Sequence, residues 1–113
     1  MAGLGCLATS PESAEDAQRL QAMLTYCIAP SGDGVVTPLV SITPQQAGDA
    51  ATVYLRQYFW TSVQHDAPQP GTEMRTQVVA RATTHANRVS GCMRSKYGLP
   101  VPSGAELVQP PSP

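Results

Sequence analysis

The sequence predicts a small all-α protein, a three-helix bundle with an extended crossover between the first two helices and extended N- and C-terminal arms. Apolar side chains recur every three or four positions in three long segments, and each segment begins with a residue that caps helices well. Stretches rich in Pro and Gly separate these segments. We therefore divide the chain into an N-terminal arm, a three-helix domain and a Pro-rich C-terminal tail, which are residues 1–9, 10–98 and 99–113.

The composition indicates a thin hydrophobic core. Leu, Ile, Val and Phe together make up just under one fifth of the 113 residues, while the formal net charge is only −1. The apolar fraction is near the level at which chains become disordered, but a high net charge, the other mark of disorder, is missing. We expect a chain that folds with little stability to spare and that gains from contacts with partner proteins.

The first predicted helix spans residues 10–29. Ser10 is a good N-cap, Pro11 suits the first helical position, and the nearby acidic residues Glu15 and Asp16 are favourable at the positive end of the helix dipole. Its apolar face contains Ala17, Leu20, Met23, Leu24, Cys27 and Ile28. In the crossover that follows, Pro38 interrupts a β-branched run, so residues 31–42 are expected to be extended but not to lie inside a sheet.

The second predicted helix, residues 43–65, is the centre of the bundle. Thr43 and Gln46 have the spacing of a capping box, with Pro44 at the first helical position. Four of the six aromatic side chains of the protein lie in this helix. Helical spacing predicts a core face of Ala47, Ala50, Ala51, Tyr54, Leu55 and Tyr58.

A second apolar stripe runs along the other side of this helix and contains Val53, Trp60 and Val63, with Arg56 among them. An ordinary surface helix needs only one apolar side. Either a second helix of the same domain covers the stripe, or the stripe docks into another protein, because exposed aromatic patches often mark interfaces.

The third predicted helix spans residues 72–97 and begins with Thr72 and Glu73. Its apolar face is Val78, Val79, Ala82, Ala86, Val89 and Met93, and Gly98 followed by Leu99 is a helix stop of the left-handed type. We expect a close antiparallel pairing with the second helix, whose alanines leave room for it.

Charge is unevenly distributed along the chain. Residues 1–73 contain seven acidic and two basic side chains, whereas residues 74–105 contain five basic side chains and no acidic one. The basic side of the third helix therefore either lies against the acidic first helix or binds a phosphate or an acidic partner. The candidates for an anion or nucleic-acid site are Arg81, His85, Arg88, Arg94 and Lys96.

The three cysteines lack the paired spacing of a disulfide scaffold. We expect Cys27 and Cys92 to be small buried side chains rather than a bridge, which only their geometry can decide. Neither the cysteines nor His65 and His85 have metal-ligand spacing, and no nucleophile, carboxylate pair or phosphate-loop motif is present. We therefore expect no metal, no cofactor and no enzymatic activity.

The sequence contains no recognisable signal peptide, transit peptide or apolar run long enough to span a membrane. It leaves the compartment undetermined. The function that we expect is that of a non-enzymatic structural or accessory subunit of a larger protein assembly, such as a virion component or a multi-subunit complex. It would bind other protein chains through the central helix and the arms. The alternative is a small nucleic-acid-associated protein that uses the basic face of the third helix.

Overall fold

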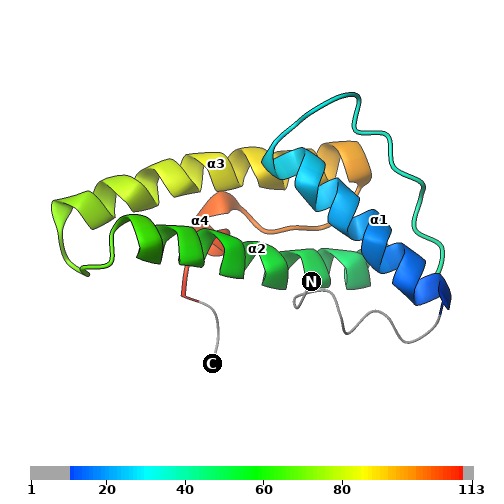
Figure 1. Cartoon of the computed structure of the whole chain (residues 1–113), viewed down its shortest axis with the longest axis horizontal. Coiled ribbons are helices and arrows are strands. Elements are labelled where there is room, and N and C mark those ends of the chain that lie inside the picture. The colour runs from blue at the N-terminus through cyan, green and yellow to red at the C-terminus, as the bar shows by residue number, and fades with distance from the viewer. Residues whose placement is uncertain (1–10, 111–113) are drawn as a thin grey trace.

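The structure is a computed structural model that describes residues 11–110, with side chains from Ser13 onward. It contains four helices, α1 (Pro11–Ile28), α2 (Pro44–Asp66), α3 (Glu73–Tyr97) and α4 (Gly104–Leu107), and no strand within this range. Helices α2 and α3 lie side by side as an antiparallel hairpin, and α1 crosses them at the end away from their connecting loop (Figure 1). The predicted all-α bundle is confirmed. The expected N-terminal arm lies outside the described residues.

The helix ends form where the sequence predicts them. The Thr43 hydroxyl accepts from the Gln46 backbone N–H at 3.1 Å, and the Gln46 side chain accepts from the Thr43 N–H at 2.9 Å, which completes the capping box. The Thr72 hydroxyl accepts from the Arg75 N–H in the same way. Gly98 has φ of 67° and ends α3, and the Leu99 N–H donates to the Met93 carbonyl.

One continuous core forms between the three long helices. Helix α2 differs from the prediction, because Phe59 and Val63 are buried while Tyr58, expected in the core, is 39% exposed. The fully buried large side chains are Phe59, Leu20, Leu24, Leu55, Met93, Leu107, Val63, Val89, Asp16, Cys27 and Ser90.

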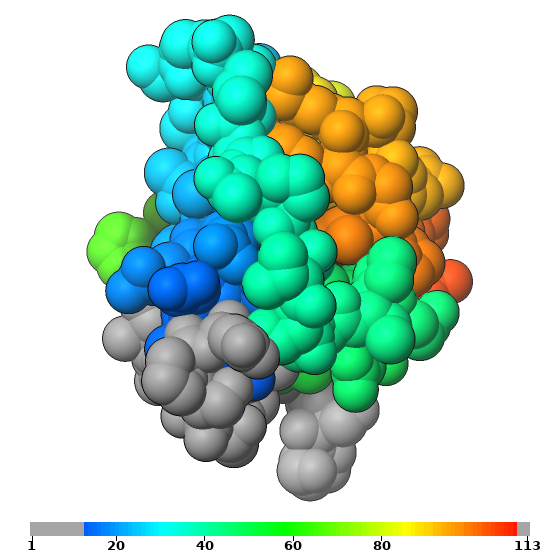
Figure 2. Space-filling view, turned by 90° about the vertical axis from the view of Figure 1, so that its right-hand side faces the viewer, coloured from blue at the N-terminus to red at the C-terminus, as the bar shows by residue number. Residues whose placement is uncertain are grey.

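The crossover between α1 and α2 is extended, as predicted. Figure 2 shows it on the surface of the molecule, between α1 on one side and the C-terminal part of α3 on the other. The Tyr97 hydroxyl donates to the Gly34 carbonyl at 2.6 Å, and this bond holds the first part of the crossover against α3.

The Pro-rich tail, expected to be an extended arm, packs on the helices over residues 99–108. Leu99, Val101, Leu107 and Val108 are buried, and residues 104–107 form α4. Four apolar side chains are too few to show as a periodic pattern. The segment that carries them lies behind the α2–α3 hairpin in Figure 1, on the opposite side from α1.

Close backbone approach explains how this tail is held. The buried Ser90 hydroxyl donates to the Pro102 carbonyl at 2.7 Å, and the Asn87 side chain accepts from the Gly104 N–H at 2.7 Å. A Cβ atom on Gly104 would lie 2.5 Å from the Asn87 backbone nitrogen, and one on Gly48 would lie 2.5 Å from the Pro100 carbonyl oxygen. Both glycines are therefore required by packing rather than by backbone conformation.

Candidate functional site

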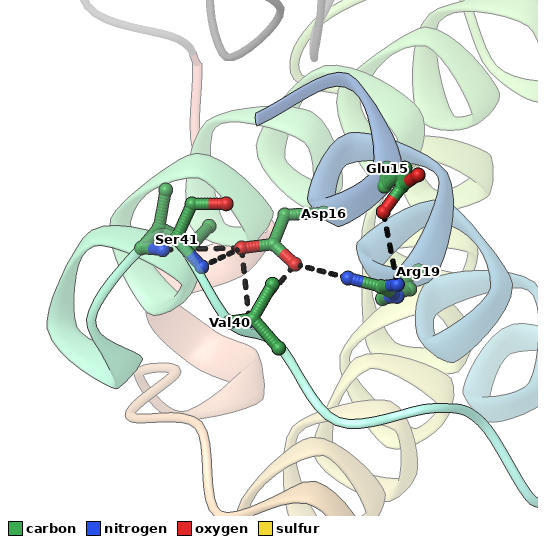
Figure 3. A network of polar contacts seen from close by, with 6 residues as sticks. Glu15, Asp16, Arg19, Val40 and Ser41 are labelled. Atoms are coloured by element: carbon green, nitrogen blue, oxygen red, sulfur yellow. Dashed lines mark hydrogen bonds and ion pairs between the residues drawn. The ribbon is translucent and has the colours of Figure 1, made fainter. Parts of the chain in front are cut away.

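Asp16, in the first helix, binds the backbone of the crossover (Figure 3). Its fully buried carboxylate accepts from the N–H groups of Val40, Ser41 and Ile42 at 2.6–3.1 Å, and from Arg19 at 2.9 Å. Burial alone would raise the pKa of Asp16, but the hydrogen bonds from the backbone and from Arg19 outweigh burial and lower it to about 2. This carboxylate therefore stays ionised and acts as a clamp on the chain itself.

Cys27 and Cys92 form a disulfide bond that joins the end of α1 to α3, with a Cα–Cα distance of 5.6 Å. The expectation of two unbridged thiols is therefore wrong. Cys27 is fully buried, as predicted, but the face of α1 that carries it packs against the face of α3 that carries Cys92. Their separation of 65 residues gives no local spacing from which the pair could be recognised.

Two of the predicted anion-binding residues cap the end of α1 instead. The Arg88 guanidinium donates to the carbonyls of Cys27 at 3.2 Å and Ile28 at 3.1 Å, and His85 Nε2 lies 3.1 Å from the same Ile28 oxygen. These carbonyls have no partner within a helix that ends there. The Arg88 guanidinium, a candidate for anion binding, is thus engaged with the backbone of α1.

The other three basic candidates have separate surroundings. The Lys96 ammonium lies over the ring of Tyr26, 5.1 Å from its centroid, and Arg94 donates to the Ser90 carbonyl at 3.4 Å. Arg81 is exposed on the side of α3 that faces α2. The structure does not gather the five residues into one free basic patch.

The predicted second stripe of α2 is used largely by the chain itself. Val63 is fully buried beside Phe59 and does not lie on the outer side as expected. The Arg75 guanidinium lies 5.3 Å from the centre of the half-buried Trp60 ring, and Arg56 donates to the Glu106 carbonyl of α4 at 3.4 Å. Only Val53, 54% exposed, remains an exposed large apolar side chain of this stripe.

A groove of about 650 Å³ lies on the other side, between α2 and α3 and close to their connecting loop. We call the part of the hairpin that forms it, residues 58–66 and 74–85, the loop half. The apolar lining of the groove comes from Tyr58, Phe59, Met74, Val78 and Ala82. Met74 is 61% exposed, and the charged side chains of Asp66 and Arg81 line the same groove.

The groove exists because α1 crosses the hairpin at the end away from the connecting loop and leaves the loop half uncovered. Helix α1 ends at Ile28, whose carbonyl lies against His85, and His85 forms the inner end of the groove. Figure 1 shows α1 over the opposite half of α2 and α3 and no helix over the loop half on that side. The loop half is therefore open to solvent on that side.

Edge-to-face aromatic packing forms the inner wall of the groove. The Phe59 ring contacts the His85 ring at 5.4 Å and the Tyr58 ring at 5.1 Å between centroids. Tyr54 stacks on Tyr58 at 6.5 Å. The sequence drew attention to this aromatic cluster, but Met74 was missed, because it belongs to the first turn of α3 and falls outside the apolar periodicity.

Within residues 11–110, no three His, Cys, Asp or Glu side chains are grouped so that they could hold a metal ion. None of the helices in this range is long and apolar enough to cross a membrane. Comparisons with protein-family models, curated proteins and solved structures gave no significant match.

Proposed function

We propose that this protein is a non-enzymatic subunit that binds another protein chain through the groove between α2 and α3. The observation that carries the proposal is the open loop half, where Met74 and Tyr58 expose apolar surface beside a concave face. Grooves of this kind, formed by two helices, take up a further helix by its apolar side.

The proposal moves the docking surface from the outer stripe of α2 to the groove. Trp60 and Arg56 already contact Arg75 and α4, so they have less to offer a partner. The tail 99–108 likewise packs on its own chain. The groove, by contrast, is lined by side chains from both helices and is covered by no described segment.

The use of the buried polar groups supports a structural rather than a catalytic role. Asp16 and Ser90 are the buried polar side chains of residues 13–110, and each binds the backbone of a distant segment. The alternative function is nucleic-acid binding by the basic side chains of α3. Fewer of these side chains are free to bind phosphate, because Arg88 and His85 contact carbonyl oxygens of α1. We therefore favour a protein partner.

Photo-cross-linking in the native host tests this proposal. A photoreactive amino acid in place of Met74 should give an adduct larger than the 11.9 kDa chain, and the adduct should be lost when Tyr58→Ser removes part of the groove wall. The matched control carries the same photoreactive group in place of Val35, which is 81% exposed on the crossover. Equal adducts from both positions, or none from position 74, would reject the groove as the docking surface.

A further inference from the structure

The charges at the groove rim are arranged in a self-complementary way. The groove carries one acidic side chain from α2, Asp66, and one arginine from α3, Arg81, together with His85 at its inner end. Of the ion pairs formed by residues 13–110, only the one with its neighbour His65 involves Asp66, and none involves Arg81. A surface with one charge of each sign can pair with a copy of itself, provided that the two charges lie at suitable positions.

Two contacts between the helices give those positions. The contact between the Phe59 and His85 rings places these two residues at the same height along the hairpin. Near the loop, the Arg75 Nε donates to the Ala67 carbonyl at 2.7 Å, which aligns Arg75 with Ala67 in the same way. With a rise of 1.5 Å per residue, Arg81 lies about 6 Å farther from the loop than Asp66, and Met74 lies about 5 Å nearer to the loop. The order along the groove, starting at the loop, is Met74, Asp66, Arg81 and Phe59.

We infer that the occupant of the groove is a second copy of this chain, docked about a two-fold axis that crosses the groove midway between Asp66 and Arg81. This inference rests on the proposed function and names its partner. This axis lays α2 on α2 and α3 on α3 of the other copy, so Asp66 of each copy comes to the level of Arg81 of the other on the facing wall. The two ion pairs then span the groove. An interface of this type uses the same patch on both subunits, as a closed dimer requires.

The same axis also places the exposed methionine. Along the groove, Met74 and Phe59 lie at about equal distances from the axis, Met74 on the loop side and Phe59 on the other side. Met74 of one copy therefore reaches the aromatic wall of Tyr58 and Phe59 in the other. Thioethers pack well against aromatic ring edges, and an exposed Met suits a surface that is covered on assembly. One operation thus satisfies the charged pair and the apolar pair, without any change in the fold of either copy.

The dimer would complete the bundle. Each hairpin would supply α2 and α3 to a four-helix arrangement at the loop halves, while α1 covers the remaining half of each hairpin. The open position described above would then be filled by the partner's hairpin, which has the apolar lining and length to fill it. This is the arrangement in which both grooves are closed at once.

Sedimentation equilibrium of the full chain over a wide concentration range tests the inference. The wild-type protein should self-associate to a dimer, and Asp66→Arg or Arg81→Glu should each weaken association at least about tenfold, because each reversal creates two repulsive pairs. The variant with both reversals should regain the wild-type affinity, because it restores both ion pairs with their signs exchanged. All four proteins should have the same far-ultraviolet circular dichroism, since both side chains are exposed.

Matched charge controls lie on the same two helices outside the groove. Asp49→Arg and Arg94→Glu cause the same changes in net charge and should leave the dimerisation constant unchanged. A monomer at all concentrations, or a dimer that the groove variants do not weaken or the double variant does not restore, would overturn the inference. If the dimer is absent while position 74 cross-links in a Tyr58-dependent way to a different protein, the proposed function stands and the self-docking fails.

Discussion

Where α1 packs on the hairpin, distant segments are tied together by a disulfide, a buried carboxylate and an arginine that binds carbonyl oxygens. In the loop half, by contrast, α2 and α3 are held around an open groove by aliphatic and aromatic packing and by Arg75, which donates to the Ala67 carbonyl and to the Gln64 side chain. We call the first region the α1 half. The difference indicates that a chain with few large apolar side chains stabilises one half with specific polar and covalent bonds. The remaining apolar surface is then left in the loop half for a partner.

Among the substitutions that test this difference, removal of the disulfide should cause the largest loss of stability. In the chain-entropy account, a bridge between residues 65 apart stabilises the fold by about 4 kcal/mol, so Cys27→Ala with Cys92→Ala should lower the melting temperature strongly. Thermal unfolding followed by circular dichroism measures this loss. Dithiothreitol should destabilise the wild-type protein but leave the double variant unaffected. A melting temperature that changes little with either treatment would show that the α1 half does not depend on the bridge.

Asp16 should be the next most sensitive position. Asp16→Asn removes the charge that binds three backbone N–H groups and should cost about 2–3 kcal/mol of unfolding free energy, measured by urea denaturation. The control is Glu15→Gln, one residue away and exposed, which should change stability by less than about 0.5 kcal/mol. Similar losses from both substitutions would mean that the clamp on the crossover is not specific to Asp16.

The pH dependence of stability should report the same clamp. The pKa of Asp16 is lowered from 3.8 to about 2 on folding, so its contribution is fully present above pH 4 and declines as the pH falls toward 2. The shift corresponds to about 2 kcal/mol. The wild-type protein should therefore lose this amount between pH 4 and pH 2 relative to Asp16→Asn. Parallel curves for the two proteins would contradict the assignment.

Two glycine-to-alanine substitutions should differ in their effect on stability, because one glycine lies in the docked tail, against α3, and the other has open space beside it. Gly104→Ala places a Cβ against the backbone of Asn87 and should cost about 1–2 kcal/mol, because a backbone atom cannot move aside easily. Gly91→Ala is the control, since its Cβ would meet nothing within 4 Å and it lies inside α3. It should stabilise the protein by up to about 1 kcal/mol. If Gly104→Ala were neutral, the tail would not be packed on α3 as described.

Met74→Ser should have the smallest effect on the isolated chain. The side chain is 61% exposed in the groove, so its loss should change the unfolding free energy by less than about 0.5 kcal/mol, as measured by urea denaturation at low protein concentration. The same substitution should weaken self-association, which distinguishes a binding residue from a core residue. Marked destabilisation of the monomer would place Met74 in the core.

Local rules in the sequence were sufficient for the helices and their ends. Thr43, Thr72 and Gly98 act within a few residues of themselves, so their roles can be predicted without knowledge of the fold. The disulfide could not be predicted in this way, because it depends on which helix faces meet. Asp16 was expected to interact with the helix dipole, and nothing in the spacing indicated that the crossover would pass over its carboxylate.

The groove was not predicted from the sequence, which placed the docking surface on the stripe of Val53, Arg56, Trp60 and Val63. The aromatic cluster of α2 pointed to this helix as an interaction site, but apolar residues on both of its sides blurred the periodicity, so Tyr58 and Val63 were assigned to the wrong faces. The place at which α1 crosses the hairpin decides where the groove is. Such a relation between distant elements cannot be read from spacing along the chain.

The most direct test of the account is a concentration series of amide NMR spectra of the full chain. From about 20 µM to about 1 mM, where a dimer of micromolar to millimolar affinity forms, shifts should change for residues 58–66 and 74–85. The amides around Asp16, Cys27 and Cys92 should remain unchanged. Spectra that do not vary with concentration, or changes concentrated in the α1 half, would contradict the assignment of the loop half as the surface where two copies of this chain meet.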